Sequence, residues 1–531
     1  MSESGMEEGS KKRRIGHSTR KAPEMKLTAK TLFLMAVAVA VQVIFLTILA
    51  NSFSALATWI EITLKVLSLI LVLIIYSREQ SSAFKMLWIM ILMLFPVFGL
   101  LFYAMVGLNL TPKTMRRRFE VVDEELKPLI PDQSQVLDRM KREDPEAASV
   151  SVYLTDYADA PVFRNSRVEY YSDTVEALQA QIEAFRRAEQ FIFIESHCIE
   201  DKVAWSWVEP VLFEKAAEGV EIRLIYDDIG IAEFMSKGFE HRMEEHGILC
   251  LDFNPVFPAI NFFLNNREHR KITVVDNQVG FTGGYNFGDE YFNITHPYGM
   301  WKDAGIRIEG EAVHMMTLTF IEMWNASKGK NKVNVEPAKY LLPLKEIRTS
   351  DGYVQPYADN PMDKENVGEN VYISMINKAR RYCWFMTPYL VITEELTQAL
   401  VLAAKRGVDV RIITPGIPDK KYVYQVTRSY YGALVRKGVR IYEWTPGFNH
   451  SKLCICDDTM ATCGTVNLDY RSFYHHFENG CYIAHCSAVE KIREDFLKTF
   501  EESHEVTEEY RRKRRIMSAW QLILRLIAPL L

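Results

Sequence analysis

Two histidines in this chain are each followed by the same series of chemically active residues. Lys271 stands two positions after His269, and Lys452 stands two positions after His450. Each series continues with an aspartate, a glycine and an asparagine at equal offsets, which gives Asp276, Gly283 and Asn286 in one copy and Asp457, Gly464 and Asn467 in the other. One His-x-Lys would mean little, but a series repeated at equal offsets indicates a site built from two halves.

Histidine and lysine together can act on a phosphodiester without a metal. Lysine ammonium groups stabilise charge on the non-bridging oxygens. One imidazole can attack phosphorus, and a second can protonate the leaving oxygen. The segments ITVV and LCIC that follow the two lysines are expected to be strands. Positions two apart on a strand share a face, so two such strands packed face to face would bring both pairs into one pocket.

The aspartates and glycines of the motif are expected to support this pocket. Asp276 and Asp457 lie an odd number of positions after their histidines, on the other strand face or past its end. Spacing therefore does not tell which histidine either carboxylate would orient. Gly283 and Gly464 would free the backbone for a tight turn.

The remaining polar residues near the motifs are candidates for phosphate binding or for holding the catalytic groups. Asn286 and Asn467 can donate to a phosphate or fix a loop. Glutamates close to the expected strand or loop ends are further candidates, namely Glu195, Glu290 and Glu478.

A zinc site is the alternative use of this region. It would draw on Cys454, Cys456, Cys463, His450, His475 and His476. Alternating cysteines on a strand are common core packing, however, and no further pair at zinc spacing completes four ligands. The eight cysteines are scattered, which indicates a reducing compartment. We therefore expect neither a metal nor another cofactor.

The chain also repeats itself outside the motifs. RRAEQFIFIESH at 186–197 is echoed by KARRYCWFMTPY at 378–389. KAAEGVEIRLIYDD at 215–228 is echoed by LAAKRGVDVRIITPG at 402–416. Helix-to-strand modules at nearly constant separation indicate a duplicated domain. Alternating helices and apolar strands predict that each copy is an α/β sandwich with a partly parallel sheet.

We expect the first module over 151–345 and the second over 346–510. The charged, proline-containing stretch 108–150 is expected to be a linker with short helices. At 531 residues the chain is long enough for such a division. A net charge of −5 argues against a nucleic-acid partner, which would need a broad basic surface.

The N-terminal part of the chain has the composition of membrane segments. About twenty apolar residues cross a bilayer as a helix, so 31–50 and 59–76 are predicted spans within a membrane region of 31–107. The apolar stretch 86–107 contains Pro96 and Gly99 in its middle. We favour a re-entrant segment there and keep a third span as the alternative.

Basic residues set the expected orientation. Lys and Arg are frequent in the tail 1–30 and follow the second predicted span, whereas the connection 51–58 has none. This distribution places the tail and the modules on the cytoplasmic side of the cell membrane, as a multi-pass protein. The basic, amphipathic tail 511–531 either rests on an anionic membrane surface or docks on the protein's own core.

The sequence H-x-K-x4-D followed by G-x-x-N, written twice, resembles the phospholipase D superfamily. The stretches 265–291, 301–313, 320–324 and 467–480, with the apolar segment 87–107, resemble its bacterial cardiolipin synthase branch. This resemblance implies two phospholipase D-like modules packed as a pseudo-dimer behind N-terminal transmembrane helices. It also implies transfer of a phosphatidyl group between two phosphatidylglycerol molecules, through a phosphohistidine, to give cardiolipin and glycerol.

The resemblance carries over a catalytic set residue by residue, namely His269, Lys271, Asp276, His450, Lys452 and Asp457. It implies that His269 is the nucleophile and that His450 is the acid and base. The family often has serine where this chain has Thr465, which keeps the hydroxyl.

Other readings of the same residues remain open at this stage. The chain could hydrolyse phospholipids to phosphatidic acid as a phospholipase D, cleave nucleic acid as a membrane-tethered nuclease, or serve as a non-catalytic membrane scaffold. The sequence does not decide between phosphatidylglycerol and phosphatidylethanolamine as donor, nor whether the chain forms a homo-oligomer.

Overall fold

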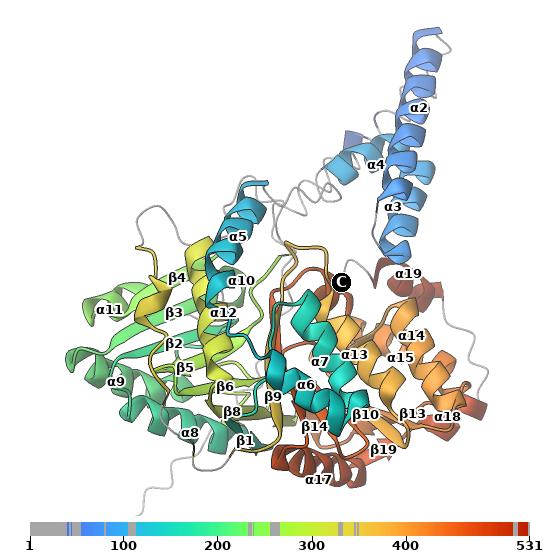
Figure 1. Cartoon of the computed structure of the whole chain (residues 1–531). Helices are drawn as coiled ribbons and strands as arrows, with labels where there is room; N and C mark the ends of the chain where they lie inside the picture. Colours follow the sequence, from blue (N-terminus) through green and yellow to red (C-terminus); the bar gives the residue numbers. More distant parts are fainter. Residues whose placement is uncertain are drawn as a thin grey trace, which may run out of the picture.

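The computed structural model describes residues 40–41, 44, 55–78, 81–104, 113–231, 236, 238–254, 266–327, 333–344, 347, 350–512 and 519–528. Two β-sheets flanked by helices form the main body, and apolar helices extend from it (Figure 1). The predicted tail 1–30 and nearly all of the predicted span 31–50 lie outside the described residues.

The first sheet has seven strands in the order β1-β8-β6-β5-β2-β3-β4. Their bounds are β1 Ser166–Tyr171, β2 Phe191–Ser196, β3 Glu221–Asp227, β4 Leu249–Phe253, β5 Lys271–Val275, β6 Val279–Gly283 and β8 Gly305–Gly310. Strands β2, β3 and β4 pair in parallel, and the other neighbours pair antiparallel. The sheet is therefore partly parallel, as the alternation of helices and strands predicted.

Helices cover both faces of this sheet. They are α8 Thr174–Arg186, α9 Val203–Ala217, α10 Asp228–Ile231, α11 Phe239–Glu245 and α12 Val313–Ser327. Ile192 and Ile194 of β2 pack in one core cluster with α8 and α9. Phe191 and Phe193 point to the opposite face and pack with α12. This alternation along one strand is why β2 is apolar on both faces.

The second sheet has eight strands in the order β19-β13-β12-β10-β15-β16-β18-β9. Their bounds are β9 Tyr353–Asp359, β10 Tyr382–Met386, β12 Asp409–Pro415, β13 Arg440–Trp444, β15 Leu453–Cys456, β16 Met460–Gly464, β18 Glu478–Ala484 and β19 Ser503–Glu505. Apart from β19, the strand order repeats that of the first sheet strand for strand. We call the modules that carry these sheets the first and second repeats.

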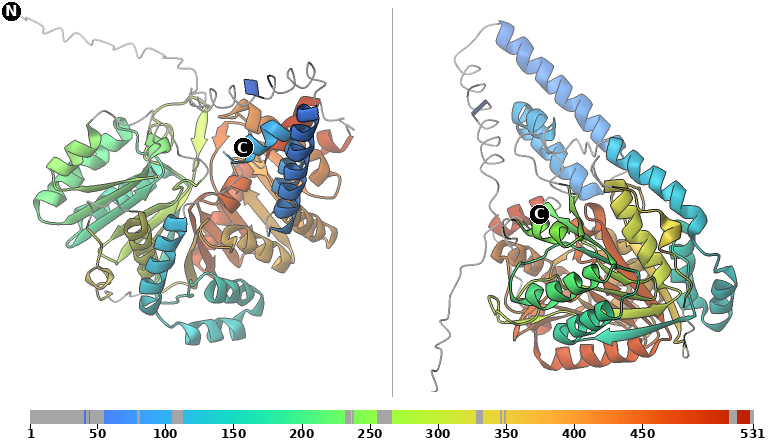
Figure 2. Two further views of the ribbon diagram at one scale, coloured as in Figure 1. Left: turned by 90° about the horizontal axis from the view of Figure 1, so that it is seen from above. Right: turned by 90° about the vertical axis from the view of Figure 1, so that its left-hand side faces the viewer.

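The second repeat has its own helices. They are α13 Val367–Lys378, α14 Glu394–Lys405, α15 Lys421–Val435, α16 Tyr470–Tyr474, α17 Ser487–Glu501 and α18 Thr507–Arg512. Short turns of 3-10 helix occur at η2 Lys127–Leu129 and η3 Pro337–Lys339. The views in Figure 2 show the two sheets side by side with helices around them.

The two repeats share a core. One cluster of buried apolar residues includes Phe193 of the first sheet, Trp384 and Leu453 of the second, and Phe496 of α17. Two small sheets add to the framework, one of β7 Met300–Lys302 with β14 Gly447–Asn449 and one of β11 Leu390–Val391 with β17 Leu468–Asp469. The first of these pairs a strand of one repeat with a strand of the other, directly before His450 of the second motif.

The segment 108–150, which the sequence predicted as a linker, contributes to both cores. Helix α5 Lys113–Leu126 packs against α12 of the first repeat. Helices α6 Ser134–Glu143 and α7 Pro145–Tyr157 share a core cluster with the second repeat, where Val150 and Leu154 are fully buried. The chain thus touches both repeats before it enters β1.

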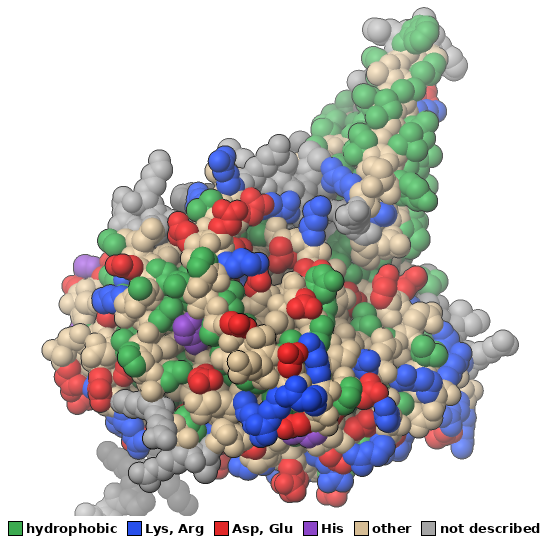
Figure 3. All heavy atoms as spheres, in the orientation of Figure 1, with side chains coloured by type: hydrophobic (Ala, Val, Ile, Leu, Met, Phe, Trp, Pro, Cys, Tyr) green, Lys and Arg blue, Asp and Glu red, His purple; other side chains and the backbone are tan. Residues whose placement is uncertain are grey.

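Among the described residues, one helix is long and apolar enough to cross a membrane. It is Thr58–Ser77 within α2 Ala55–Ser77, which coincides with the predicted span 59–76. The stretch after it forms α3 Ser82–Leu94 and α4 Pro96–Phe102, divided before Pro96. A Cβ on Gly99 would lie 2.8 Å from the Leu92 Cα, so α4 folds closely against α3. Apolar side chains cover the extension that α2 forms (Figure 3).

The base of this apolar extension rests on the second repeat. The Phe84 ring of α3 lies 5.7 Å from that of Tyr470, 5.9 Å from that of Tyr474 and 5.3 Å from that of His475. A C-terminal helix, α19 Ala519–Ile527, contacts both α3 and α15. The apolar helices are therefore packed against the same repeat that carries the second motif.

Candidate functional site

The two motifs place their histidines and lysines at the start of equivalent strands. Lys271 opens β5, and Lys452 stands directly before β15. The relative exposures of these four motif residues lie between 2% and 8%. Lys271 Nζ donates to the His269 carbonyl at 2.7 Å, and Lys452 Nζ donates to the His450 carbonyl. Each ammonium group therefore lies beside its own histidine, as the strand spacing predicted.

Each histidine takes its acidic partner from the other repeat. His269 Nδ1 lies 2.8 Å from a Glu478 carboxylate oxygen, and His450 Nδ1 lies 2.7 Å from one of Asp303. Both carboxylates are buried, with relative exposures of 0% and 1%. The structure thus combines the two motifs into one interlocked site.

The backbone repeats the same exchange. The His269 N–H donates to the Phe477 carbonyl at 3.0 Å, and the His450 N–H donates to the Lys302 carbonyl at 2.7 Å. Phe477 and Lys302 directly precede the acidic partners of the two histidines. Backbone hydrogen bonds as well as side-chain contacts therefore hold each histidine against the other repeat.

These contacts set the tautomer of each imidazole. An ionised carboxylate only accepts hydrogen bonds, so Nδ1 of each neutral ring carries the proton and Nε2 keeps a free lone pair. Burial, followed by the charge of Lys271, lowers the pKa of His269 well below its usual value. Burial and the charge of Lys452 lower the pKa of His450 to about 4, although Asp303 opposes this shift. Both rings are thus neutral and nucleophilic near pH 7 before an anion enters.

Burial also lowers the pKa values of the two motif lysines. It lowers the pKa of Lys271 to about 8, and it lowers the pKa of Lys452 to about 7. Nearby carboxylates, including Glu478 and Asp303, partly offset the effect at both lysines. A phosphodiester anion would favour the charged form of each ammonium, because opposite charges at short distance stabilise one another.

Glu478 is itself held in place by hydroxyl groups of its own repeat. Ser472 Oγ donates to one carboxylate oxygen at 2.7 Å, and Thr465 Oγ1 donates to the other. The Thr465 oxygen in turn accepts from the Asn479 N–H at 2.9 Å. Thr465 therefore helps to position His269 indirectly, because it holds the Glu478 carboxylate that binds the imidazole.

The structure does not bring the motif aspartates to the histidines. The Asp276 carboxylate accepts from the backbone N–H groups of Glu189, Gln190 and Phe191 at 2.7–2.8 Å. Asp457 accepts in the same way from Arg380, Arg381 and Tyr382 at 2.6–2.8 Å. Each carboxylate fastens the start of the neighbouring antiparallel strand, β2 or β10, to the far end of the motif strand.

The motif glycines allow two strands to approach closely. A Cβ on Gly283 would lie 2.7 Å from the Gly305 Cα, and one on Gly464 would lie 2.5 Å from the Gly480 Cα. Gly305 and Gly480 each lie two positions after the acid that binds the histidine of the other repeat. The close approach of the paired glycines thus fixes the position of each acid relative to the histidine that it binds.

The asparagines and the other glutamates take varied positions. Asn286 accepts from the Cys198 N–H at 3.3 Å and donates to the Tyr291 hydroxyl at 2.7 Å. The buried Asn467 Oδ1 has no hydrogen-bond partner among the described residues. Glu195 lines a cavity of about 20 Å³ with Lys271, and burial raises its pKa to about 7.

Glu290 is next in the chain to Tyr291, whose ring lies 5.5 Å from that of His450. Burial, followed by the neighbouring charge of Glu200, raises the pKa of Glu290 to about 7. Among the described residues, no hydrogen bond joins its side chain to either motif histidine. Its predicted supporting role therefore has no contact behind it.

Several site residues were not singled out from the sequence. Asp303 is the most important, and rings of Tyr291 and Trp301 lie 5.5 and 5.1 Å from that of His450. His197 was also not singled out, and its ring lies 5.3 Å from that of His269, measured between centroids. The ring of His476, which the sequence analysis named as a possible zinc ligand, lies at the same distance. The sequence could have pointed to Asp303. It lies two positions before Gly305, as Glu478 lies two positions before Gly480, and each of these glycines faces the motif glycine of its own repeat.

Two groups of side chains in the described part of the chain lie close enough to share a metal ion. One is Cys383 with Cys454 and Cys456, and the other is His269 with His476 and Glu478. Burial raises the pKa of all three thiols, which keeps them protonated and poor as ligands. In the second group, the carboxylate already binds His269, Thr465 and Ser472.

Comparisons with known proteins place this architecture in a family. Residues 372–500 match a family model described as cardiolipin synthase, PLD-like domain. Residues 66–107 match one described as phospholipase D-nuclease N-terminal. The second match covers the C-terminal half of α2 together with α3 and α4.

Relatives are similar over nearly their whole length. An uncharacterized protein of Streptococcus mutans serotype c is 38% identical over 87% of this chain and 99% of its own. Cardiolipin synthase of Alkalihalophilus pseudofirmus is 32% identical over 85% of this chain and 90% of its own. That of Halalkalibacterium halodurans is 31% identical over 86% and 91%. The chain belongs to the cardiolipin synthase family of phospholipase D-like proteins, which confirms the resemblance found in the sequence.

A solved structure shares the fold. Phosphatidylserine synthase of Haemophilus influenzae matches with a TM-score of 0.54 at 11% identity, and the match covers 72% of this chain and 98% of that one. At this identity the likeness shows the fold alone.

Proposed function

We propose that this protein is a cardiolipin synthase. It transfers a phosphatidyl group from one phosphatidylglycerol to the hydroxyl of another and releases glycerol. The observation that carries the proposal is the crossed pairing of His269 with Glu478 and of His450 with Asp303 in a family of this activity. This pairing leaves two imidazoles with free Nε2 atoms, and two lysines lie beside them.

The first half of the reaction forms a covalent intermediate. The His269 Nε2 lone pair attacks phosphorus, and the bond from phosphorus to the glycerol oxygen breaks. His450, protonated once the phosphate anion has entered, gives its proton to that oxygen and glycerol leaves. Lys271 and Lys452 stabilise the charge on the non-bridging oxygens as the bonds change.

The second half reverses these roles for a new acceptor. The neutral His450 takes a proton from the glycerol hydroxyl of a second phosphatidylglycerol. The oxygen attacks phosphorus, the bond to His269 breaks, and cardiolipin forms. Glu478 and Asp303 hold the two rings in one tautomer throughout, as positioning residues. In this mechanism Asp276 and Asp457 stabilise the fold through hydrogen bonds from backbone N–H groups and take no part in the chemistry.

The membrane region supports transfer to a lipid over transfer to water. Phe84 of α3 packs on Tyr470 and Tyr474, in the helix between the second motif and Glu478. The site is thereby held close to apolar helices, where a second phospholipid is concentrated. Loss of water from such a site also strengthens its electrostatic interactions.

The proposed organisation follows the sequence expectations. The modules 151–345 and 346–510 form a pseudo-dimer on the cytoplasmic side of the cell membrane. The hairpin of spans 31–50 and 59–76 anchors them, and α3 with α4 forms a re-entrant element. The divided helix and the close contact at Gly99 support the re-entrant form.

Lipid product analysis tests this function. Purified protein is incubated with phosphatidylglycerol vesicles, with His269→Ala as the control. We expect cardiolipin and glycerol in equal amounts from the wild type and neither from the variant. Phosphatidic acid as the main product would instead make the protein a hydrolase.

A further inference from the structure

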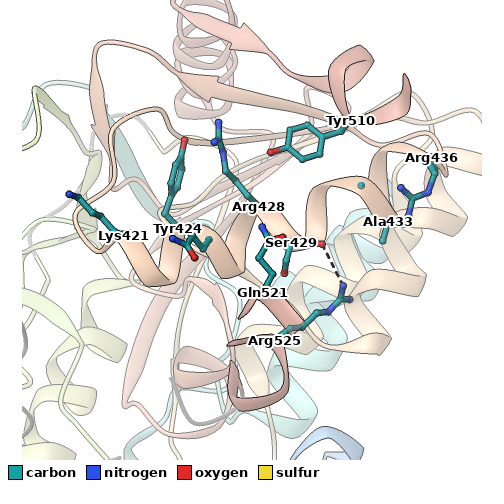
Figure 4. Close-up of a pocket in the computed structure, with 11 residues that line it drawn as sticks. Lys421, Tyr424, Arg428, Ser429, Ala433, Arg436, Tyr510, Gln521 and Arg525 are labelled. Carbon is teal, nitrogen blue, oxygen red and sulfur yellow. Dashed lines mark hydrogen bonds between the residues drawn. The ribbon is translucent and has the colours of Figure 1, made fainter. Parts of the chain in front are cut away.

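A second polar cavity lies outside the paired motifs. It has a volume of about 470 Å³ and lies between α15, α18 and α19 (Figure 4). Basic side chains line it, namely Lys421, Arg428, Arg436 and Arg525. Among the described residues, no acidic side chain belongs to its lining.

The sequence of α15 builds this cavity by helical spacing. Lys421, Gln425, Arg428, Gly432 and Arg436 recur every three or four residues and so share one face. Gly432 leaves a hollow between the two arginines, because it has no side chain. A Cβ there would lie 3.0 Å from the Arg436 guanidinium. The hollow and its basic rim therefore arise from one stretch of sequence.

The basic groups differ in how they are held. Arg428 donates to both carboxylate oxygens of the buried Glu443, at 2.8 and 2.7 Å, so one positive charge is compensated behind the cavity wall. Arg525 stacks over Tyr430, with its guanidinium 4.4 Å from the ring centroid. Lys421 and Arg436 are exposed, and no ion pair joins either to an acid among the described residues. The lining keeps a net positive charge.

The position of the cavity beside the apolar helices favours a lipid as its ligand. Helix α19, which supplies Gln521 and Arg525, contacts α3 of the apolar extension. Leu524 of α19 and Ala528, directly after it, are buried against the second repeat, while Leu522 and Ile523 remain 50% and 51% exposed. An amphipathic helix at the base of an apolar extension lies where phospholipid headgroups begin.

We propose that this cavity is a second, non-catalytic site that binds the phosphodiester headgroup of an anionic glycerophospholipid in the bilayer. Its size suits a headgroup. Arginine and lysine are the side chains that recognise phosphate. The site would hold the second repeat against anionic membrane through α15 and α19, apart from the histidines, and it needs no catalytic turnover.

Hydrogen–deuterium exchange of the full chain in detergent micelles locates the site. Exchange over 421–436 and 519–528 is compared with phosphatidylglycerol, with phosphatidylcholine, and with glycerol phosphate added to phosphatidylcholine micelles. Of these three conditions, we expect only phosphatidylglycerol to slow exchange in both segments. The His269→Ala variant should show the same protection, which separates this site from the proposed reaction.

Paired variants test the lining. Lys421→Gln with Arg436→Gln should raise the phosphatidylglycerol needed for half-maximal protection by about tenfold or more, since two charged donors are lost. Lys405→Gln with Lys437→Gln removes equal charge from exposed positions outside the cavity and should leave the protection unchanged. If the first pair fails to fold, each single variant is measured in the same way.

Three results would overturn the proposal. Protection by glycerol phosphate would make this a site for free anions, and equal weakening by both pairs would reduce it to general charge. No protection by phosphatidylglycerol in the wild type would mean that the cavity binds no headgroup.

Discussion

His269 belongs to the first repeat, yet its Nδ1 lies 2.8 Å from Glu478 of the second. His450 and Asp303 make the reciprocal contact at 2.7 Å. Duplication alone would have given two equivalent motifs. The crossed contacts make each motif depend on the other repeat for the orientation of its histidine, so the active unit is the pair.

Loss of the Glu478 charge should impair the reaction without removing a reacting group. In Glu478→Gln, the amide can offer a donor to Nδ1, which would then favour the tautomer with its proton on Nε2. We expect kcat to fall by about a hundredfold or more, with little change in KM. Steady-state kinetics on phosphatidylglycerol in mixed micelles measures this.

A matched control is Glu369→Gln, another buried glutamate, which binds Thr393 and Tyr474. It should retain most of the activity. Equal losses in the two variants would show that Glu478 matters only for folding.

The buried lysines predict an alkaline loss of activity. The pKa of Lys452 is lowered to about 7 and that of Lys271 to about 8, so each loses its proton as pH rises through these values. The neutral amines no longer attract the phosphate, and kcat/KM, which reports the free enzyme, should fall between pH 7 and about 9. Lys452→Arg should move this fall to higher pH, because arginine stays charged. A flat profile to pH 9 in the wild type would contradict the assignment.

The motif aspartates should matter for stability more than for chemistry. Asp276 accepts three backbone hydrogen bonds at the start of β2, so Asp276→Ala leaves one buried and two partly buried donors without this partner. We expect the free energy of unfolding to fall by about 2–4 kcal/mol, measured by thermal or denaturant unfolding.

His269→Ala provides the opposite case, with turnover lost and unfolding nearly unchanged. Full stability in Asp276→Ala together with lost turnover would return this aspartate to the catalytic set.

The contact between α3 and the second repeat should favour lipid acceptors. Phe84→Ala removes ring contacts to Tyr470, Tyr474 and His475, each pair of rings contributing about 0.5–1.5 kcal/mol. We expect cardiolipin formation in vesicles to fall several-fold, while turnover of a short-chain substrate in detergent is kept. Phe98→Ala removes a ring from the stack with Phe102, away from the site, and serves as the control. An equal effect of both variants would argue against a specific coupling.

The sequence predicted the parts of this site that depend on local periodicity. His269 with Lys271, and His450 with Lys452, share a face because positions two apart on an extended chain do so. The repeated helix and strand patterns likewise predicted two α/β modules with partly parallel sheets, which the structure has.

What the sequence left open depends on contacts between distant elements. Asp303 faces His450 only because β7 pairs with β14, and no local pattern encodes that pairing. The stretch 108–150 was predicted as a linker because it is charged and contains prolines, yet its helices α6 and α7 pack on the second repeat. The family resemblance placed Asp276 and Asp457 in the catalytic set, but both lie at the far end of the motif and accept hydrogen bonds from backbone N–H groups there.

The most direct test of the two-half site is to trap the covalent intermediate. Protein incubated with phosphatidylglycerol is quenched in denaturant at a pH that preserves phosphoramidates, digested, and mapped by mass spectrometry in the wild type and in Glu478→Gln. We expect a phosphatidyl adduct on the peptide that carries His269, with less of it in the variant. An adduct on His450, or none in an enzyme that still makes cardiolipin, would contradict this expectation.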